Sequence, residues 1–401
     1  IRQNKEKWVK NQQPIRYNNQ KQVIDLMRSG SQSCSDIAKA TGLSNTAAEN
    51  IVDEMVEMGV LVKGPITDYG KLGRRPIKYK LNGELGVVVS VDLTDRDLLI
   101  CISNMNRQIL FRSEVKNIIM ITEQILNDIV EIIKEGLQKP GISDKPLLCI
   151  CFAIPGYFNK DTGEFLLANR IENCREVNIK SLFSEIFGCD ILLQKDIISG
   201  VIGEMQFGVL STLQAKNALF MHFDINIASA FIFDGKMYEG DHGFAGETGF
   251  FMPNMSDPAK GLGIYVSLTA IFINIIEKIK KEKLSHPLAG KEVLEFDEVK
   301  LLFLSGDETV CSVVKLTAKK LALHFLNINY LLDITHVVLD GRIVELGEKF
   351  LEYVNTYLKK YNQGMSEVKV QYSDLMNRAI TLGSISSAVD SQIDKILRAR
   401  N

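Results

Sequence analysis

A short stretch near the N-terminus carries a full set of local signals for two helices joined by a tight turn. Ser33 and Asp36 match a capping box, in which each side chain can bond the backbone amide of the other residue. The helix that follows ends at Gly42, a residue that permits the positive φ of a sharp turn. Ser44 then caps a second helix over residues 45–58. This spacing predicts a helix-turn-helix.

Two strand-like runs follow at 60–63 and 77–81, and they flank a loop rich in glycine and basic residues. The loop reads Gly-Lys-Leu-Gly-Arg-Arg-Pro over residues 70–76. A hairpin with a cationic tip beside a second helix is typical of a winged helix, and such a tip suits a narrow A·T-rich minor groove. Helix-turn-helix shapes also serve as protein-docking modules, and basic loops are often only solvated, so that alternative stays open.

The start of the second helix and the basic loop supply the candidate DNA contacts. Asn45 and Asn50 can pair bidentately with adenine in the major groove. Glu49 on the same surface would repel phosphate, so we expect the loop and its phosphate contacts to dominate affinity. The predicted DNA-binding residues are Asn45, Thr46, Asn50, Lys71, Arg74 and Arg75.

Charge is distributed unevenly along the chain, although the formal net charge is only −2. Residues 1–83 hold 14 Lys and Arg against 8 Asp and Glu, a net charge of +6, and the remainder carries −8. A basic segment followed by an acidic body indicates a nucleic-acid-binding unit attached to a domain with another role. Chance clustering is the alternative reading of the charge alone.

Composition predicts a globular protein of the cytoplasm. The chain has 401 residues, enough for two or three domains, and 46% of them are hydrophobic. No run of about 18 uncharged apolar residues predicts a membrane span, and no signal-peptide pattern is visible at the polar, basic start. The seven cysteines are scattered and odd in number, which fits a reduced compartment.

The rest of the chain contains two α/β units of similar order, each with antiparallel strands followed by a helix and a further strand. The first unit is expected to have strands at 86–93, 98–103, 108–114 and 147–154 and a helix near 125–133. The second is expected to have strands at 217–224, 228–234 and 336–339 and a helix over 264–282. This order predicts an α/β fold with two lobes and a cleft between them. The expected domains are 1–83, 84–205 completed by a helix over 380–401, and 206–379.

Several motifs in this order resemble the ROK family (repressors, open reading frames, kinases), in its repressor branch. The resemblance covers nearly all of residues 18–400. It is carried by the loop at 73–76, the Ile-Pro-Gly turn at 154–156, the Asp-Gly-Lys-Met-Tyr-Glu-Gly run at 234–240, the Ala-Gly-Glu-Thr-Gly run at 245–249, Gly341 and the Leu-Gly-Ser helix start at 382–384. It implies a winged helix-turn-helix followed by a two-lobed, actin-like and ribonuclease H-like sugar-kinase fold.

The resemblance also implies where a kinase would hold ATP, and both phosphate loops lack their glycines here. The first loop is Asp-Leu-Thr-Asp-Arg over 92–96, and the second is Asp-Ile-Asn-Ile-Ala-Ser-Ala over 224–230. Glycine lets backbone amides approach phosphates closely, and Asp95 and Asp224 would repel a triphosphate. We therefore expect no ATP binding, no enzymatic activity and no cofactor.

Asp196 stands at the position of the family's catalytic base. Since we expect no phosphoryl transfer, this base position is expected to be vestigial. Lys195 stands where the family usually has asparagine. It can pair with Asp196 and lower its pKa, or meet an anionic ligand, or serve only as a structural ion pair.

The family's zinc site is also absent from the sequence. The run Glu-Thr-Gly-Phe at 247–250 has Phe250 in place of a histidine ligand, and the stretch 252–262 contains no cysteine. We expect no metal. An apolar cluster is expected to replace the crosslink, formed by Phe250, Phe251, Met252 and Leu262.

Sugar-binding positions are partly retained. The resemblance assigns effector contacts to Asn169, Lys195, Asp196 and Glu247. At two further positions the family has polar residues, and this chain has Phe250 and Ile264. A neutral hexose is therefore expected to bind weakly or in another pose, since each lost charged hydrogen bond costs about 1.5–3 kcal/mol. Lys195, Arg170 and Arg175 favour an acidic or phosphorylated sugar. A cleft that no longer binds any sugar is the alternative.

These features predict a DNA-binding transcriptional regulator, most simply a repressor, of carbohydrate-metabolism genes. Its body is expected to form a homodimer or a dimer of dimers on a double-stranded, two-fold operator, with a sugar or sugar derivative in the interlobe cleft. Two alternatives remain: a ROK-type sugar kinase with an accessory DNA-binding domain, and a regulator whose body is only a dimer or protein-docking scaffold. No membrane partner is expected.

Overall fold

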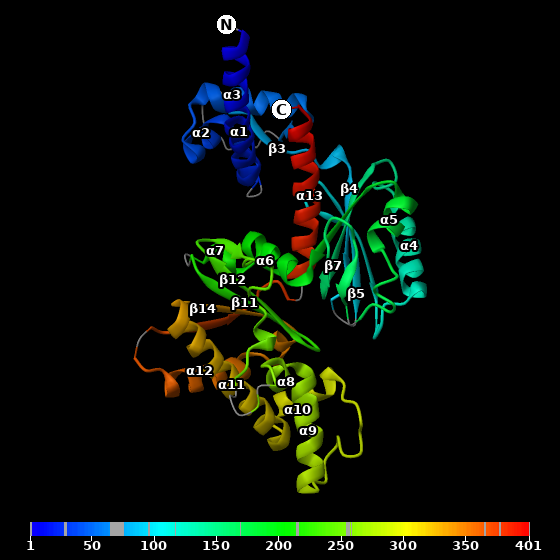
Figure 1. The fold of residues 1–401 in the computed structure, drawn as a ribbon, viewed down its shortest axis with the longest axis vertical. Coiled ribbons are helices and arrows are strands. Elements are labelled where there is room, and N and C mark those ends of the chain that lie inside the picture. Colours follow the sequence, from blue (N-terminus) through cyan, green and yellow to red (C-terminus); the bar gives the residue numbers. More distant parts are fainter. Residues whose placement is uncertain are drawn as a thin grey trace, which may run out of the picture.

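The N-terminal residues form three helices against a small sheet, and two five-stranded sheets follow along the chain (Figure 1). The computed structural model describes residues 2–27, 30–64, 76–94, 97–116, 118–168, 170–213, 216–253, 257, 259–364, 366–376 and 378–400. Within these ranges, no helix combines the length and the apolar character that crossing a bilayer requires.

The N-terminal unit has the elements of a winged helix. Its helices are α1 (Arg2–Met27), α2 (Cys34–Thr41) and α3 (Asn45–Glu57). Its antiparallel sheet has the order β1-β3-β2, with β1 (Gln32–Ser33), β2 (Leu61–Lys63) and β3 (Lys78–Leu81). Residues 65–75, between β2 and β3, lie outside the described residues, and with them the predicted contacts Lys71, Arg74 and Arg75.

The predicted caps of α2 and α3 are present. The Ser33 amide donates to the Asp36 carboxylate over 3.0 Å, and the Asp36 amide donates to Ser33 Oγ over 3.2 Å. Because the Ser33 hydroxyl and amide both donate to this carboxylate, the pKa of Asp36 is lowered. Gly42 ends α2 with a φ of 74°, and Ser44 Oγ accepts the Ala47 amide at the start of α3.

The first lobe is a five-stranded sheet with α4 and α5 on one face and α13 on the other (Figure 1). The strand order is β10-β7-β4-β5-β6, parallel from β10 to β4 and antiparallel from β4 to β6. Because both faces are covered, the central strands are apolar along most of their length. The elements are β4 (Val87–Asp92), β5 (Leu98–Asn104), β6 (Ile109–Val115), α4 (Glu123–Leu137), β7 (Leu147–Ile154), α5 (Ile179–Phe187), β10 (Asp190–Lys195) and α13 (Ala379–Arg400).

The second lobe repeats this arrangement with the strand order β13-β12-β11-β14-β15. One face of the sheet packs on α8 to α12, and the other packs on α6 and α7. The elements are α6 (Asp196–Phe207), α7 (Val209–Thr212), β11 (Ala218–Phe223), β12 (Ile227–Phe233), β13 (Lys236–Tyr238), α8 (Gly263–Val266), α9 (Leu268–Glu282), α10 (Phe296–Ser305), α11 (Glu308–Leu332), β14 (His336–Gly341), α12 (Glu348–Tyr361) and β15 (Lys369–Tyr372). The predicted α/β fold with two lobes is confirmed.

Helices α6 and α13 cross with their backbones in direct contact. A Cβ atom added at Gly203 of α6 would collide with the carbonyl oxygen of Ala379 in α13. One added at Gly383 of α13 would collide with the carbonyl oxygen of Ser199 in α6. Both crossing points therefore need the absence of a side chain, and they join the helix that begins the second lobe to the helix that ends the chain.

The far end of α13 is built into the winged-helix unit. Val389, Ile393 and Leu397 of α13 belong to the same buried apolar cluster as the inner faces of α1, α2 and α3. Around this cluster the Arg398 guanidinium lies 4.9 Å from the centre of the Tyr17 ring. Lys21 and Asp394 form an ion pair of 3.4 Å. The winged-helix unit is thus packed on α13 through a shared core rather than tethered by a linker alone.

The helix crossing yields a stability prediction. Gly203→Ala or Gly383→Ala is expected to lower the free energy of unfolding by about 1–3 kcal/mol, because overpacking outweighs the roughly 1 kcal/mol of helix propensity that alanine adds. The matched control is Gly263→Ala, where the added Cβ has only ordinary contacts beyond 3.5 Å. Urea denaturation measures the difference, and wild-type stability in both crossing variants would contradict the close packing.

Candidate effector-binding site

A cavity of about 580 Å³ lies between the lobes, beside the carboxyl ends of β7, β10 and β11. Its first-lobe wall consists of Thr94 after β4, residues that follow β7, and Lys195 at the end of β10, and α6 adds Asp196 and Ile197. Its second-lobe wall comes from the loop after β11, from the turn η2 (Thr248–Phe250), and from α8 and α9. This is the usual position of ligands in α/β folds, because the strand ends leave a crevice there. The location agrees with the predicted cleft.

Three of the four predicted effector contacts line this cavity, namely Lys195, Asp196 and Glu247. The fourth, Asn169, lies outside the described residues. Asp196 is the first residue of α6 and is only 9% exposed. The partial positive charge of the helix N-terminus favours a carboxylate there, and its Oδ1 accepts the Ile197 amide over 2.7 Å.

The Lys195 ammonium is held by several groups at once. It lies 3.5 Å from Glu247 Oε1 and donates to the carbonyl oxygen of Gly243 over 3.0 Å. The centre of the Tyr157 ring is 4.3 Å away, and that of the Phe244 ring is 5.5 Å away. Lys195 therefore has an acidic partner from the second lobe, Glu247, in addition to any role beside Asp196.

Tyr157 is a site residue that the sequence reasoning missed. Burial raises the pKa of its phenol well above the ordinary value, and its hydrogen bond to Glu247 and the charges of Glu247 and Asp196 act in the same direction. The phenol therefore stays protonated near neutral pH and acts as a donor. Its place directly after the Pro155-Gly156 turn was the available signal, since that turn ends a buried strand at the cavity edge.

The two arginines that were expected to attract an anion have other positions. Arg170 donates to the carbonyl oxygens of Leu93 over 3.0 Å, of Ile118 over 2.6 Å, and of Thr94. It lines the cavity, but its guanidinium joins the backbone after β4, at Leu93 and Thr94, to the backbone after β6, at Ile118. Arg175 is exposed in the following turn and is not among the residues described as lining the cavity.

A third arginine spans the lobes beside the 224–230 loop, which the sequence resemblance compares with the second phosphate loop of kinases. Arg342 follows β14, at the start of the turn η3 (Arg342–Leu346). Its guanidinium is 3.3 Å from Asp97 of the first lobe and 3.8 Å from Asp224 of the second. The 224–230 loop thus presents a carboxylate in contact with an arginine.

The apolar replacements of the family's polar residues do not form the expected cluster. Phe250 is 71% exposed and Ile264 is 57% exposed, and both line the cavity. Phe251 packs its ring 5.0 Å from that of His324, and Leu262 is buried in the core of the second lobe. Met252 is exposed. The predicted four-residue cluster was wrong because Leu262 points into the core while Phe250 and Met252 point outward.

No group of three or more His, Cys, Asp or Glu side chains in the described part of the chain is arranged to hold a metal ion.

The predicted helix contacts to DNA, Asn45, Thr46 and Asn50, are all exposed at the start of α3. They are distant in sequence from the cavity residues. Helix α6 begins at the cavity, whereas the end of α13 packs on the unit that contains α3.

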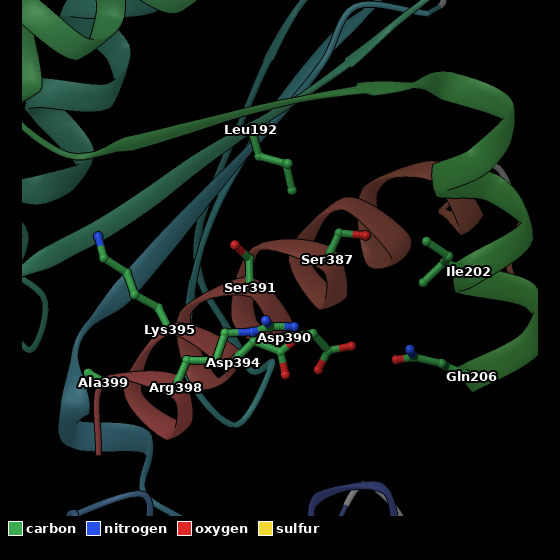
Figure 2. A pocket seen from close by; sticks show the side chains of 10 residues that line it. All are labelled: Leu192, Ile202, Gln206, Ser387, Asp390, Ser391, Asp394, Lys395, Arg398 and Ala399. Atoms are coloured by element: carbon green, nitrogen blue, oxygen red, sulfur yellow. The ribbon is translucent and has the colours of Figure 1, made fainter. Parts of the chain in front are cut away.

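A second, wider groove of about 940 Å³ runs along α13 beside α6 (Figure 2). Several of its charged side chains already have partners. Asp394 pairs with Lys21, Lys395 pairs with Asp190 over 2.7 Å, and Arg398 contacts Tyr17. These contacts make the groove part of the joint between α13 and its neighbours rather than a second candidate for the effector.

The sequence profile of the ROK family matches residues 88–390. The chain belongs to the ROK family. It is 24% identical to a xylose repressor of Caldicellulosiruptor bescii, over 89% of this chain and 91% of that one. It is 22% identical to a xylose repressor of Bacillus subtilis, over 94% and 96% of the two chains.

Solved ROK structures share the fold. A ROK family transcriptional regulator, a homologue of the E. coli MLC protein, superposes with a TM-score of 0.76 at 17% identity, over 96% of this chain and 98% of that one. A ROK family glucokinase from Streptomyces griseus, in complex with glucose and AMPPNP, superposes with a TM-score of 0.64 at 16% identity, over 76% and 100%. The resemblance seen in the sequence is confirmed.

A buried carboxylate farther along α6 makes stability depend on pH. Burial raises the pKa of Glu204 from 4.5 to about 7; the charge of Asp340 adds to this, while a hydrogen bond from the Ser373 hydroxyl opposes it. Asp340 is itself buried and paired with His222, with 2.8 Å between Nδ1 and Oδ2. The folded protein thus holds a proton on Glu204 that the unfolded chain releases.

The free energy of unfolding is therefore expected to fall as pH rises from about 4.5 to about 7, since the unfolded chain binds fewer protons in this window. Glu204→Gln removes this dependence. Between pH 5 and pH 8 the unfolding free energy of the variant should therefore rise by about 1–3 kcal/mol relative to that of wild type. Denaturant titrations at both pH values measure the change, with the exposed Glu185→Gln as control. An equal pH dependence in Glu204→Gln and wild type would contradict the assignment.

Proposed function

We propose that the chain is a DNA-binding transcriptional repressor of carbohydrate-metabolism genes, controlled by a sugar bound between its lobes. The observation that carries the proposal is the packed connection from the cavity to the winged helix. Helix α6 starts at Asp196 in the cavity and crosses α13, whose other end shares a core with α1, α2 and α3. Full-length similarity to proteins named xylose repressors supports the same reading.

The cavity chemistry supports a neutral sugar as effector. The Lys195 ammonium already faces Glu247, and the Arg170 guanidinium already serves three backbone carbonyls, so neither is a ready partner for an anion. Asp196 and Glu247 can accept hydrogen bonds from sugar hydroxyls, and the phenol oxygen of Tyr157, whose proton is directed at Glu247, can accept another. Asn169 is proposed as a further contact. Since the relatives are named xylose repressors, xylose is the first sugar to test.

The DNA contacts are proposed on two elements. Asn45, Thr46 and Asn50 present their side chains from the exposed start of α3, where a recognition helix enters the major groove. Lys71, Arg74 and Arg75 are proposed to bind phosphates and the minor groove. A repressor of this kind works in the cytoplasm, in contact with the chromosome.

A homodimer, or a dimer of dimers, is proposed to place two winged helices on a two-fold operator. Helix α11 offers a surface for such an assembly. Leu316, Leu323 and Tyr330 are exposed at a spacing of seven residues, which puts them on one face of the helix. An exposed apolar stripe of this kind is typical of an association surface.

Sugar phosphorylation is the competing function, because Asp196 keeps the position of the family's base and several solved neighbours are kinases. The carboxylate of Asp224 opposes it, because Asp224 belongs to the loop that the resemblance compares with a phosphate loop, and Arg342 there already pairs with Asp224 and Asp97. Sustained release of ADP from ATP in the presence of a sugar would favour the kinase.

The DNA assignment predicts a loss of affinity on removing the basic loop. The double variant Arg74→Ala, Arg75→Ala is expected to weaken operator binding about tenfold or more. The slope of log K against log salt concentration should also become shallower by about 2, because two phosphates are no longer neutralised. Gel shift over a salt series with the protein's own promoter region measures both quantities. The control is Lys160→Ala, a basic exposed residue of the first lobe. Unchanged binding would refute the loop contact.

The effector assignment predicts variants that still bind the operator but no longer release it when sugar is added. Asp196→Asn and Glu247→Gln are expected to bind the operator like wild type without sugar and to remain bound at sugar concentrations that release wild type, because each loses a charged acceptor for a hydroxyl. Fluorescence anisotropy of a labelled operator, titrated with xylose, checks this. Release at the same sugar concentration in both variants would exclude the two carboxylates as contacts.

A further inference from the structure

The lining of the cavity between the lobes includes a polar cluster, here called the polar end, and a set of exposed apolar side chains, here called the mouth. Lys195, Asp196, Glu247 and Tyr157 surround the polar end, where hydroxyl groups find charged and phenolic partners. The mouth consists of four large apolar side chains that line the cavity and are at least half exposed: Leu167, Phe250, Ile264 and Ile273. Large apolar side chains exposed along a cavity are a mark of ligand contact.

The Phe250 ring is directed outward by its backbone. The turn η2 packs so tightly on Gly261 that a Cβ atom added there would lie 3.0 Å from the Phe250 Cα. The Leu262 amide also donates to the Phe251 carbonyl oxygen over 2.7 Å. These contacts fix the backbone on both sides of Phe250, so its exposure reflects the local fold rather than an unpacked chain.

The mouth is shared between the lobes. Leu167 ends the strand β9 (Phe165–Leu167) of the first lobe, whereas Phe250, Ile264 and Ile273 come from η2, α8 and α9 of the second. A group bound there would contact both lobes at once. It would therefore add to the free energy that favours one lobe arrangement, which is the quantity an effector must supply.

A single sugar ring uses only part of this site. A volume of about 580 Å³ lies within the range of pockets for ligands larger than one small ring. A ring held by Asp196 and Glu247 makes its hydrogen bonds at the polar end. A second ring, placed flat on Phe250, would cover apolar surface of the mouth, since aromatic faces stack on the apolar face of a sugar or on another aromatic ring.

We propose that the effector is a sugar carrying a second ring, either a disaccharide or an aryl glycoside, with that ring bound at the mouth formed by Leu167, Phe250, Ile264 and Ile273. The inference rests on the proposed control by a sugar and names the class of that sugar. Phe250 is the residue that sets the preference. The first ring binds at the polar end, as in the proposed function, and the second ring adds apolar contact on both lobes.

The test compares ligand classes on the full chain by isothermal titration calorimetry. The ligands are D-xylose and D-glucose, each as the free sugar, as its 1→4-linked disaccharide and as its 4-nitrophenyl glycoside. At least one two-ring ligand is expected to bind about tenfold or more tightly than its free sugar, a difference of about 1.4 kcal/mol. Stronger binding of the disaccharide or of the aryl glycoside tells the two sources of the second ring apart.

Phe250→Ala is expected to remove this advantage while leaving the Kd of the free sugar within about threefold. The matched control is Met252→Ala, an exposed apolar side chain two residues away that is not among the described lining residues. Free sugars that bind as tightly as every two-ring ligand, or a Phe250→Ala effect equal for all ligands, would overturn the inference and leave sugar control intact. Absence of binding by all six ligands would overturn both.

Discussion

The contact between α6 and α13 is the constraint on which the rest of the structure depends. At Gly203 and Gly383 the two helix backbones touch, and no other residue type fits without moving one helix. Because α6 begins at the cavity and α13 ends in the winged helix, the chain has only two rigid elements between its proposed sugar site and its proposed DNA surface. Close packing makes such a pair move together rather than independently.

Arginine side chains lie at both segments that the sequence resemblance compares with kinase phosphate loops. Arg170 binds backbone carbonyls behind the first loop, and Arg342 bridges Asp97 and Asp224 beside the second. These ion pairs and hydrogen bonds link residues of both lobes beside the cavity. The proposed sugar would therefore act on lobes that the protein's own side chains already connect.

Local signals were predictable from the sequence, and long-range partnerships were not. The capping box at Ser33, the turn at Gly42 and the buried strands follow from a few neighbouring residues, so the winged helix and both lobes were anticipated. Lys195 was identified as a site residue, but its contacts with Tyr157, Phe244 and Glu247 come from segments 38 to 52 residues away. Glycine packing between α6 and α13 depends on a crossing that no local pattern encodes. All the DNA and effector contacts remain predictions, and four of them, Asn169, Lys71, Arg74 and Arg75, lie outside the described residues.

The shared core between α13 and the winged helix also bears on how such proteins can diversify. Val389, Ile393 and Leu397, near the end of the chain, complete the hydrophobic centre of helices formed near its beginning. A recombination event that exchanged only the N-terminal segment would leave the new helices facing the wrong apolar surface. Operator specificity in this architecture is therefore inherited most safely by substitution on the exposed face of α3, or by exchange of both chain ends together.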